Sequence, residues 1–161
     1  MLAALALSAA LAGASVDVDL PALFADELPN VTARTDVPVL LPQRMPSEHE
    51  RHVPSGFGGT RRWGLQIAAV PNCGGATACF IASFTGRRGG PGPSGAERVR
   101  LARGRIGRFT PLSCGASCAP PRIEWRERGA TYGIQANVGT QRTERRILVA
   151  MADSAIRNGP R

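Results

Sequence analysis

The fold of this chain is decided by residues 123–138, IEWRERGATYGIQANV. Apolar side chains occupy every second position on both sides of a turn at residues 127–129, which ends in Gly129. A period of two places these side chains on one face of a strand. The stretch therefore predicts an antiparallel hairpin with one buried face, formed by Ile123, Trp125, Tyr132, Ile134, Ala136 and Val138.

The same alternation appears on the N-terminal side of this hairpin. Residues 63–69 and 80–84 each place apolar side chains on one face, and the turn between them holds Cys73 and Cys79. This pattern predicts a second hairpin. Residues 98–101 read Arg-Val-Arg-Leu, which predicts a further strand with a basic outer face.

Apolar residues at helical spacing occur near both ends of the remaining chain. Asp19 is placed to cap a short N-terminal helix with the apolar stripe Leu20, Leu23, Phe24 and Leu28. Thr143 is placed to cap a C-terminal helix with the apolar stripe Ile147, Leu148, Met151, Ala152 and Ala155. Each stripe needs an apolar surface to cover it, and the sheet provides one.

We therefore expect an α+β domain: an antiparallel sheet of about five strands, with the N-terminal and C-terminal helices packed on one face. Residues 37–42, VPVLLP, predict an edge strand or extended segment, because each Pro removes a ladder donor. Flexible loops are expected near residues 43–61 and 86–96, which are rich in Gly, Pro and polar residues. The expected core contains Trp63, Phe80, Trp125, Tyr132, Ile134, Leu148 and Met151.

Length and composition fit one such domain, covering residues 15–161. The chain has 161 residues, and Leu, Ile, Val and Phe make up 35 of them. That share is close to the roughly 20% below which chains remain disordered, so the core is expected to be thin. No segment after the first sixteen residues is apolar enough to cross a bilayer.

Residues 1–14 are expected to form a signal peptide. The first sixteen residues carry no charged side chain, and Ala12-Gly13-Ala14 supplies small residues before a cleavage site at Ser15. The start also lacks the usual basic residues, which leaves the signal boundary open. A buried Ala/Leu helix is the alternative interpretation. We expect a secreted or periplasmic protein.

Four cysteines, an even number, favour disulfides in an exported protein with a thin core. The pairs Cys73–Cys79 and Cys114–Cys118 are favoured because Gly residues mark a turn in each short loop, although three connectivities are possible. A four-thiolate zinc site is the alternative, but the C-x5-C and C-x3-C spacings depart from the usual knuckles. No C-x-x-C redox motif is present.

Several phrases together resemble landmarks of uncharacterised exported bacterial proteins. They are VPVLLP at residues 37–42, the C-x5-C at residues 73–79, CGASC at residues 114–118, and the W-x3-G-x2-Y pattern at residues 125–132. The resemblance covers roughly residues 20–157. It implies export and a compact domain with disulfides, and it implies no catalytic residue.

The charge is distributed unevenly. All 20 basic residues are Arg, and the formal net charge is +8. Residues 1–50 have a balance of −5, whereas residues 51–161 have a balance of +13. Guanidinium groups bind phosphate or carboxylate in bidentate geometry, which predicts an anion-binding surface. The alternative is codon bias with a solvated surface. The candidate residues are Arg61, Arg62, Arg87, Arg88, Arg98 and Arg100, with Arg103, Arg105 and Arg108 beside them.

The only histidines, His49 and His52, lie between glutamates in the phrase SEHERH. A His-x-x-His pair can ligate a metal, but a catalytic zinc needs a third protein ligand. A solvated loop is the simpler interpretation. No GxSxG, HExxH or P-loop motif occurs, and the Gly-rich loop at residues 89–95 contains two Pro and no following apolar helix.

These observations favour a non-enzymatic envelope or extracellular binding domain with a basic surface and no cofactor. Its expected partner is an anionic envelope component: a glycan, a lipid head group or an acidic protein. Nucleic acid is not expected, because the protein is exported and has only eight aromatic residues. The alternative function is a metal-dependent hydrolase that uses the His49/His52 segment.

Overall fold

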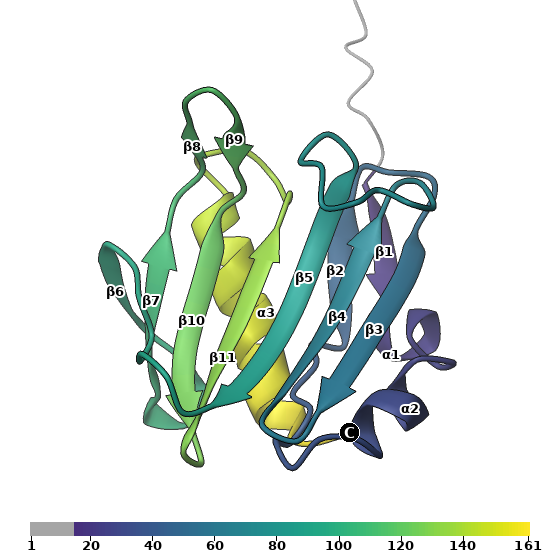
Figure 1. Ribbon diagram of the computed structural model, residues 1–161. Helices are drawn as coiled ribbons and strands as arrows, with labels where there is room; N and C mark the ends of the chain where they lie inside the picture. Colours follow the sequence, from purple (N-terminus) through teal and green to yellow (C-terminus); the bar gives the residue numbers. More distant parts are fainter. Residues whose placement is uncertain (1–14) are drawn as a thin grey trace, which may run out of the picture.

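The computed structural model describes residues 15–161, and its central element is a seven-stranded antiparallel sheet (Figure 1). The strand order is β3-β4-β5-β11-β10-β7-β6. All neighbours in the sheet pair in antiparallel register. The strands are β3 (Val53–Gly59), β4 (Arg62–Ala68), β5 (Phe80–Arg88), β6 (Glu97–Arg100), β7 (Ile106–Thr110), β10 (Arg122–Glu127) and β11 (Ala130–Ala136).

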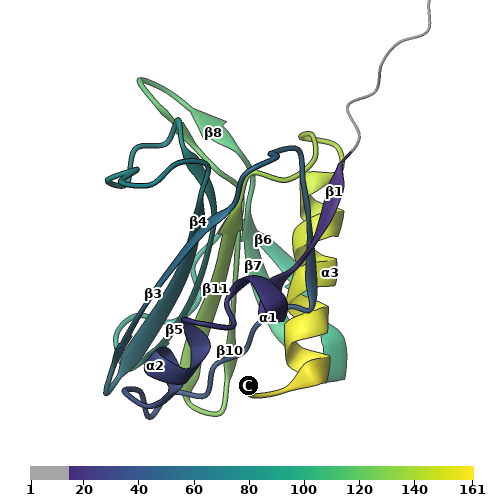
Figure 2. The same cartoon turned by 90° about the vertical axis from the view of Figure 1, so that its right-hand side faces the viewer.

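A second layer covers one face of this sheet (Figure 2). It contains the helix α3 (Glu144–Asn158) and a two-stranded sheet of β1 (Val16–Asp19) and β2 (Arg44–Ser47). Two short helices, α1 (Leu20–Leu23) and α2 (Leu28–Thr32), complete the layer together with the turn η1 (Ala102–Gly104). The result is a two-layer α+β domain, and within residues 15–161 no helix covers the opposite face of the sheet (Figure 2).

The core lies between the two layers and contains the predicted hairpin. Trp125 and Tyr132 are direct cross-strand partners, and their rings stack with centroids 5.6 Å apart. Burial raises the pKa of Tyr132 to about 12, with the nearby Glu127 as the second cause. On the helix side, Leu148 and Met151 are buried. The hairpin and the C-terminal helix therefore contribute to one core, as their apolar patterns predict.

The N-terminal helix is divided in two. Asp19 caps α1, with its side chain accepting a hydrogen bond from the Ala22 amide, and this bond lowers the pKa of Asp19. The chain then turns and begins α2, so the expected single helix is two short ones. At the other end, α3 begins after Thr143, whose side chain bonds within residues 140–143 and does not cap the helix.

Two expectations about the sheet are wrong. It has seven strands and not about five. Residues 43–61 contain β2 and β3 where we expected a loop. Residues 37–42, for which we expected an edge strand or an extended segment, form no strand of the sheet and make one isolated bridge, between Leu40 and Pro160. These residues are nevertheless buried, because Val37, Val39 and Leu41 pack in the core.

The expectation that Phe80 lies in the core is also wrong. The register between β4 and β5 shifts next to Ile67: Ile67 is opposite Ala82, whereas Ala68 is opposite Phe80. One extra residue, Ile81, therefore lies on β5. A bulge of this kind moves the residues beyond it to the other face. Phe80 consequently lies outside the core and is only half-buried.

The structure pairs Cys73 with Cys79 and Cys114 with Cys118, the neighbouring pairs favoured by the sequence. The first link closes the loop between β4 and β5. The second closes the small hairpin of β8 (Ser113–Cys114) and β9 (Cys118–Ala119). Both loops lie at one end of the sheet (Figure 1). The signal-peptide prediction for residues 1–14 lies outside the described residues.

Candidate functional site

The candidate site is the face of the seven-stranded sheet opposite the helices (Figure 2), which we call the open face. Its side chains alternate along each strand with those of the core. On β10, for example, Ile123 and Trp125 are buried in the core, so Arg122, Glu124 and Arg126 lie on the open face. The strand register arranges these side chains in cross-strand rows, and these rows determine the chemistry of the face.

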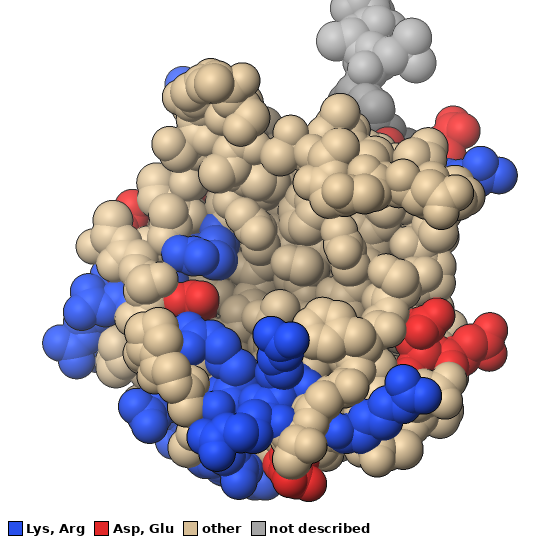
Figure 3. Space-filling view, in the orientation of Figure 1, with Lys and Arg blue, Asp and Glu red and all other residues tan. Residues whose placement is uncertain are grey.

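One row consists mainly of arginines. Arg62 on β4 is opposite Arg87 on β5, Arg87 is opposite Thr131 on β11, and Thr131 is opposite Arg126 on β10. We call Arg62, Arg87 and Arg126 the arginine row. Figure 3 shows positive side chains gathered over this end of the sheet.

The arginine row has no acidic partner within 4 Å among residues 15–161. Like charges directly opposite one another on a sheet are destabilising. The arrangement therefore does not stabilise the fold through ion pairing. Such a row suits an anion, because three guanidinium groups from neighbouring strands remain unneutralised on one face.

The other predicted arginines lie in different places. Arg98 on β6 is opposite Arg108 on β7, and together with Arg100 they extend the basic surface to the sheet edge. Arg61 lies in the turn between β3 and β4 against Gly89. Arg88 points away from the open face, where its guanidinium donates to the Asp36 carbonyl at 3.5 Å.

Two other arginines near the predicted set have partners elsewhere. Arg105 pairs with Glu127 at 3.4 Å, and Arg103 donates to the Arg157 carbonyl. Conversely, Arg126 was not singled out by sequence reasoning. Its alternation with Trp125 in the predicted hairpin was the signal that could have identified it.

A second row, four residues along β5 from the first, is neutral and hydrogen-bonding. We call Ser55, Gln66, Ser83 and Gln135 the polar row, since each is opposite the next across β3, β4, β5 and β11. Arg122 continues the row on β10. Ser55 is exposed, whereas the side chains of Gln66, Ser83 and Gln135 are partly buried. The row offers both donors and acceptors.

Between the arginine row and the polar row, two of the open-face positions are glycines, which have no side chain. Gly64 and Gly133 occupy open-face positions on either side of Thr85. The ring of Phe57 lies over Gly64, so closely that an added Cβ there would collide with it. Phe57 is 53% exposed, and the Arg62 guanidinium lies over its ring at 5.8 Å. The centre of the face is therefore a shallow hollow beside an aromatic ring (Figure 3).

The two disulfide loops rise at the end of the face beyond the polar row. Gly75 and Thr77 from one loop and Ser117 and Cys118 from the other line a depression of about 400 Å³. Its floor includes Gln66, Ser83 and Gln135. The loops therefore form walls at the polar end of the open face, opposite the arginine row (Figure 1).

The Gly-rich segment at residues 89–96 is held on the open face. The amide and hydroxyl of Ser94 donate to Glu124 at 2.7 and 2.9 Å. Arg87 donates to the Pro91 carbonyl at 2.7 Å. These bonds attach Pro91 and Ser94 to the open face and use the carboxylate of Glu124, the only acid on β10 that faces outward.

The histidine segment lies between β2 and β3, away from the open face. His52 is hydrogen-bonded to the Ser47 hydroxyl at 2.8 Å. Burial lowers the pKa of His52, and the neighbouring His49 lowers it further. In the part of the chain that the structure describes, no three His, Cys, Asp or Glu side chains are grouped to hold a metal ion.

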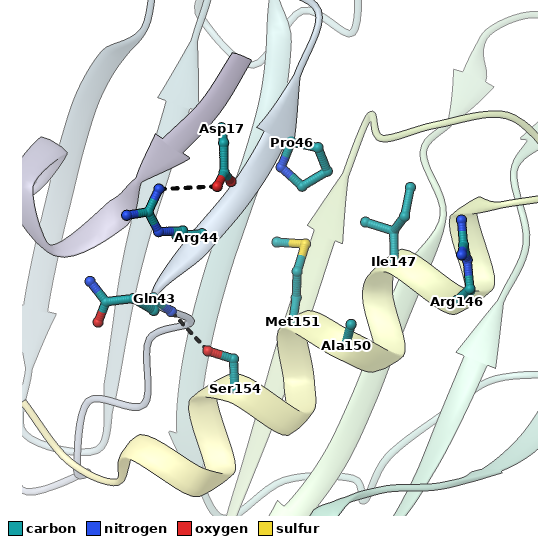
Figure 4. Close-up of a pocket in the computed structure, with 9 residues that line it drawn as sticks. All are labelled: Asp17, Gln43, Arg44, Pro46, Arg146, Ile147, Ala150, Met151 and Ser154. Carbon is teal, nitrogen blue, oxygen red and sulfur yellow. Dashed lines mark hydrogen bonds and ion pairs between the residues drawn. The ribbon is translucent and has the colours of Figure 1, made fainter. Parts of the chain in front are cut away.

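A separate groove lies in the covering layer, between α3 and the strands β1 and β2 (Figure 4). Its volume is about 540 Å³, and Ile147, Ala150 and Met151 give it an apolar floor. Asp17 and Arg44 form an ion pair at 3.1 Å beside it. The groove has one unpaired arginine at its rim, Arg146, among the described residues, so its charge is weaker than that of the open face.

Comparison with known proteins finds no matching family model, no matching curated protein and no matching solved structure. Between Ser15 and Arg161, no helix is long and apolar enough to cross a membrane.

Proposed function

We propose that this chain is an exported, non-enzymatic binding domain that holds an anionic component of the envelope or the surrounding medium on its open face. The observation that carries this proposal is the arginine row. Arg62, Arg87 and Arg126 lie in one cross-strand line without an acidic partner among residues 15–161. A bound anion relieves the repulsion between these neighbouring charges.

The proposed location rests on different features. Two disulfides close the loops at one end of the sheet, and such bonds persist in oxidising compartments. The apolar first sixteen residues, with small residues before Ser15, support export by a signal peptide. A secreted or periplasmic protein meets phosphate, sulfate and carboxylate groups on lipids and glycans.

Binding to three anionic probes tests this proposal: polygalacturonate, inorganic polyphosphate and phosphatidylglycerol vesicles. We expect binding to at least one probe at low salt, with affinity that falls as salt rises and screens the charges. The triple variant Arg62→Gln, Arg87→Gln and Arg126→Gln should weaken binding at least about tenfold, since each arginine near an anionic surface contributes about 1 kcal/mol.

The matched control removes the same number of charges elsewhere. Arg51, Arg142 and Arg146 are exposed and lie outside the seven-stranded sheet. Their triple change to Gln alters the net charge equally and should have the smaller effect. Equal losses in the two variants, or no binding of any probe, would contradict an anion site on the open face.

A further inference from the structure

We infer that the ligand of the open face is an acidic oligosaccharide or polysaccharide, with sugar units on the polar row and Phe57 and acidic groups on the arginine row. This inference rests on the proposed function, because it assigns a chemical class to the anion. It uses the neutral half of the open face, which anion binding alone leaves without a role.

The polar row has the chemistry that sugar hydroxyls require. A sugar hydroxyl both donates and accepts hydrogen bonds. The glutamine amides and serine hydroxyls of the polar row also do both, so they can act as its partners. Gln135 directs its amide nitrogen to the Pro120 carbonyl at 3.1 Å, which fixes the amide and leaves its oxygen as an acceptor on the face. Phosphate and sulfate groups accept hydrogen bonds only, so a row with acceptors is not explained by them.

Phe57 and the hollow beside it fit a sugar ring. The Phe57 ring lies over Gly64 and beside the Arg62 guanidinium, with about half of the residue's surface exposed. The C–H face of a sugar ring is apolar and packs on such a flat ring, while its hydroxyls point sideways to polar groups. A hollow of about 300 Å³ beside the Phe57 ring, lined also by Gln66, Ser83 and Thr85, gives depth for the ligand in the centre of the face.

The spacing of the two rows indicates more than one sugar unit. Ser83 and Arg87 lie four residues apart on β5, which corresponds to about 13 Å along a strand. A single sugar cannot contact both rows, whereas a short oligomer can cross from the disulfide loops to the arginine row. The ligand is therefore an oligomer in which acidic groups accompany neutral hydroxyls.

Other anionic macromolecules use less of this face. A lipid surface would contact the arginines and leave the polar row beside the disulfide loops empty. Single-stranded nucleic acid stacks its bases on a series of aromatic rings, and Phe57 is the only aromatic residue among the exposed large hydrophobics of residues 15–161. The combination of amides, hydroxyls, one exposed ring and arginines favours an acidic glycan.

Titration calorimetry with two polyanions separates this inference from the proposed function. The probes are a uronic acid oligomer and inorganic polyphosphate with the same number of charges. The wild-type protein should bind the uronic acid oligomer about tenfold more tightly, which corresponds to one or two net hydrogen bonds.

Two variants assign the difference to the polar row. The change of Gln66 and Gln135 to Ala should weaken uronic acid binding about tenfold and leave polyphosphate binding within about twofold. Gln141→Ala, at an exposed position outside the sheet, is the control and should change neither. Phe57→Leu should weaken only the uronic acid oligomer, and unfolding curves of all variants verify that they are folded.

The remaining outcomes contradict either the glycan inference or the proposed function. If polyphosphate binds as tightly as the uronic acid oligomer and the polar-row variant changes neither, the glycan inference is wrong and anion binding stands. Tighter binding of vesicles or of a single-stranded oligonucleotide likewise overturns the glycan. If no polyanion binds, the proposed function itself fails.

Discussion

Arg62 on β4 and Arg87 on β5 are direct cross-strand partners on the open face, and neither has an acidic partner within 4 Å among residues 15–161. Their guanidinium groups have other contacts. Arg62 lies over the Phe57 ring, and Arg87 donates to the Pro91 carbonyl. These contacts hold both side chains in place while their charges remain available to a ligand, so the fold presents a preorganised pair of anion-binding groups.

The pair Arg98 and Arg108 tests the cost of such arrangements, since both are exposed and directly opposite. We expect Arg98→Gln to raise the free energy of unfolding by about 0.2–1 kcal/mol by removing the repulsion. Arg98→Lys keeps the charge and should show no gain. In about 1 M salt the gain should vanish, because the Debye length is then about 3 Å. Denaturant unfolding measures this, and a loss of stability in Arg98→Gln would argue against repulsion.

The disulfides should stabilise the fold modestly. Each link closes a loop of fewer than ten residues, for which the chain-entropy estimate is about 2 kcal/mol. The change of Cys114 and Cys118 to Ser should lower the free energy of unfolding by about that amount. Thiol titration without reductant should find no free thiol, and peptide mapping should recover the pairs Cys73–Cys79 and Cys114–Cys118. Cross-links between the two pairs would disprove this connectivity.

Leu148 connects α3 to the sheet and is fully buried. Leu148→Ala should lower the free energy of unfolding by about 2–5 kcal/mol, because it removes apolar contacts and leaves a cavity. The control is Arg146→Ala, at an exposed position on the same helix, which should stay within about 0.5 kcal/mol. Urea denaturation provides both values. Equal effects of the two changes would mean that α3 is not docked on the sheet in solution.

His52 should make stability depend on pH. Its pKa in the folded protein is lowered by burial and by His49, so the unfolded chain binds a proton more readily. Stability should therefore fall as the pH decreases from about 7 through the ordinary histidine value of about 6.5. His52→Asn removes this titration and should flatten the dependence between about pH 7 and pH 5. Unfolding curves at both pH values compare the two proteins, and an unchanged slope in the variant would refute the role of His52.

The sequence predicts the hairpin of residues 123–138 well, because its large apolar residues alternate without interruption and form the centre of the sheet. It fails at β3, which reads as a loop because it contains Pro54 and several glycines. The structure explains why a strand contains these residues. Gly56 and Gly58 allow α2 to approach the strand closely, with the Val31 carbonyl over Gly58, and Pro54 is tolerated on an edge strand.

The candidate site was predicted less completely, for two physical reasons. Alternation identifies which arginines point outward on one strand, but only the register brings Arg62, Arg87 and Arg126 into one row. The register shift beside Ile67 could not be read from the apolar pattern, and it places Phe80 next to the polar row. The residues of the polar row come from four strands that are separated in the sequence, so no local sequence motif predicts the row.

The most direct test of anion binding on the open face is an amide chemical-shift titration of the folded protein with inorganic polyphosphate, which supplies the charge alone. We predict the largest shifts at Thr85, Arg87 and Thr131 on the open face, with little change at Ala150 and Ser154 in the groove beside α3. Shifts concentrated in that groove, or spread evenly over the exposed arginines of the whole surface, would contradict the proposed site.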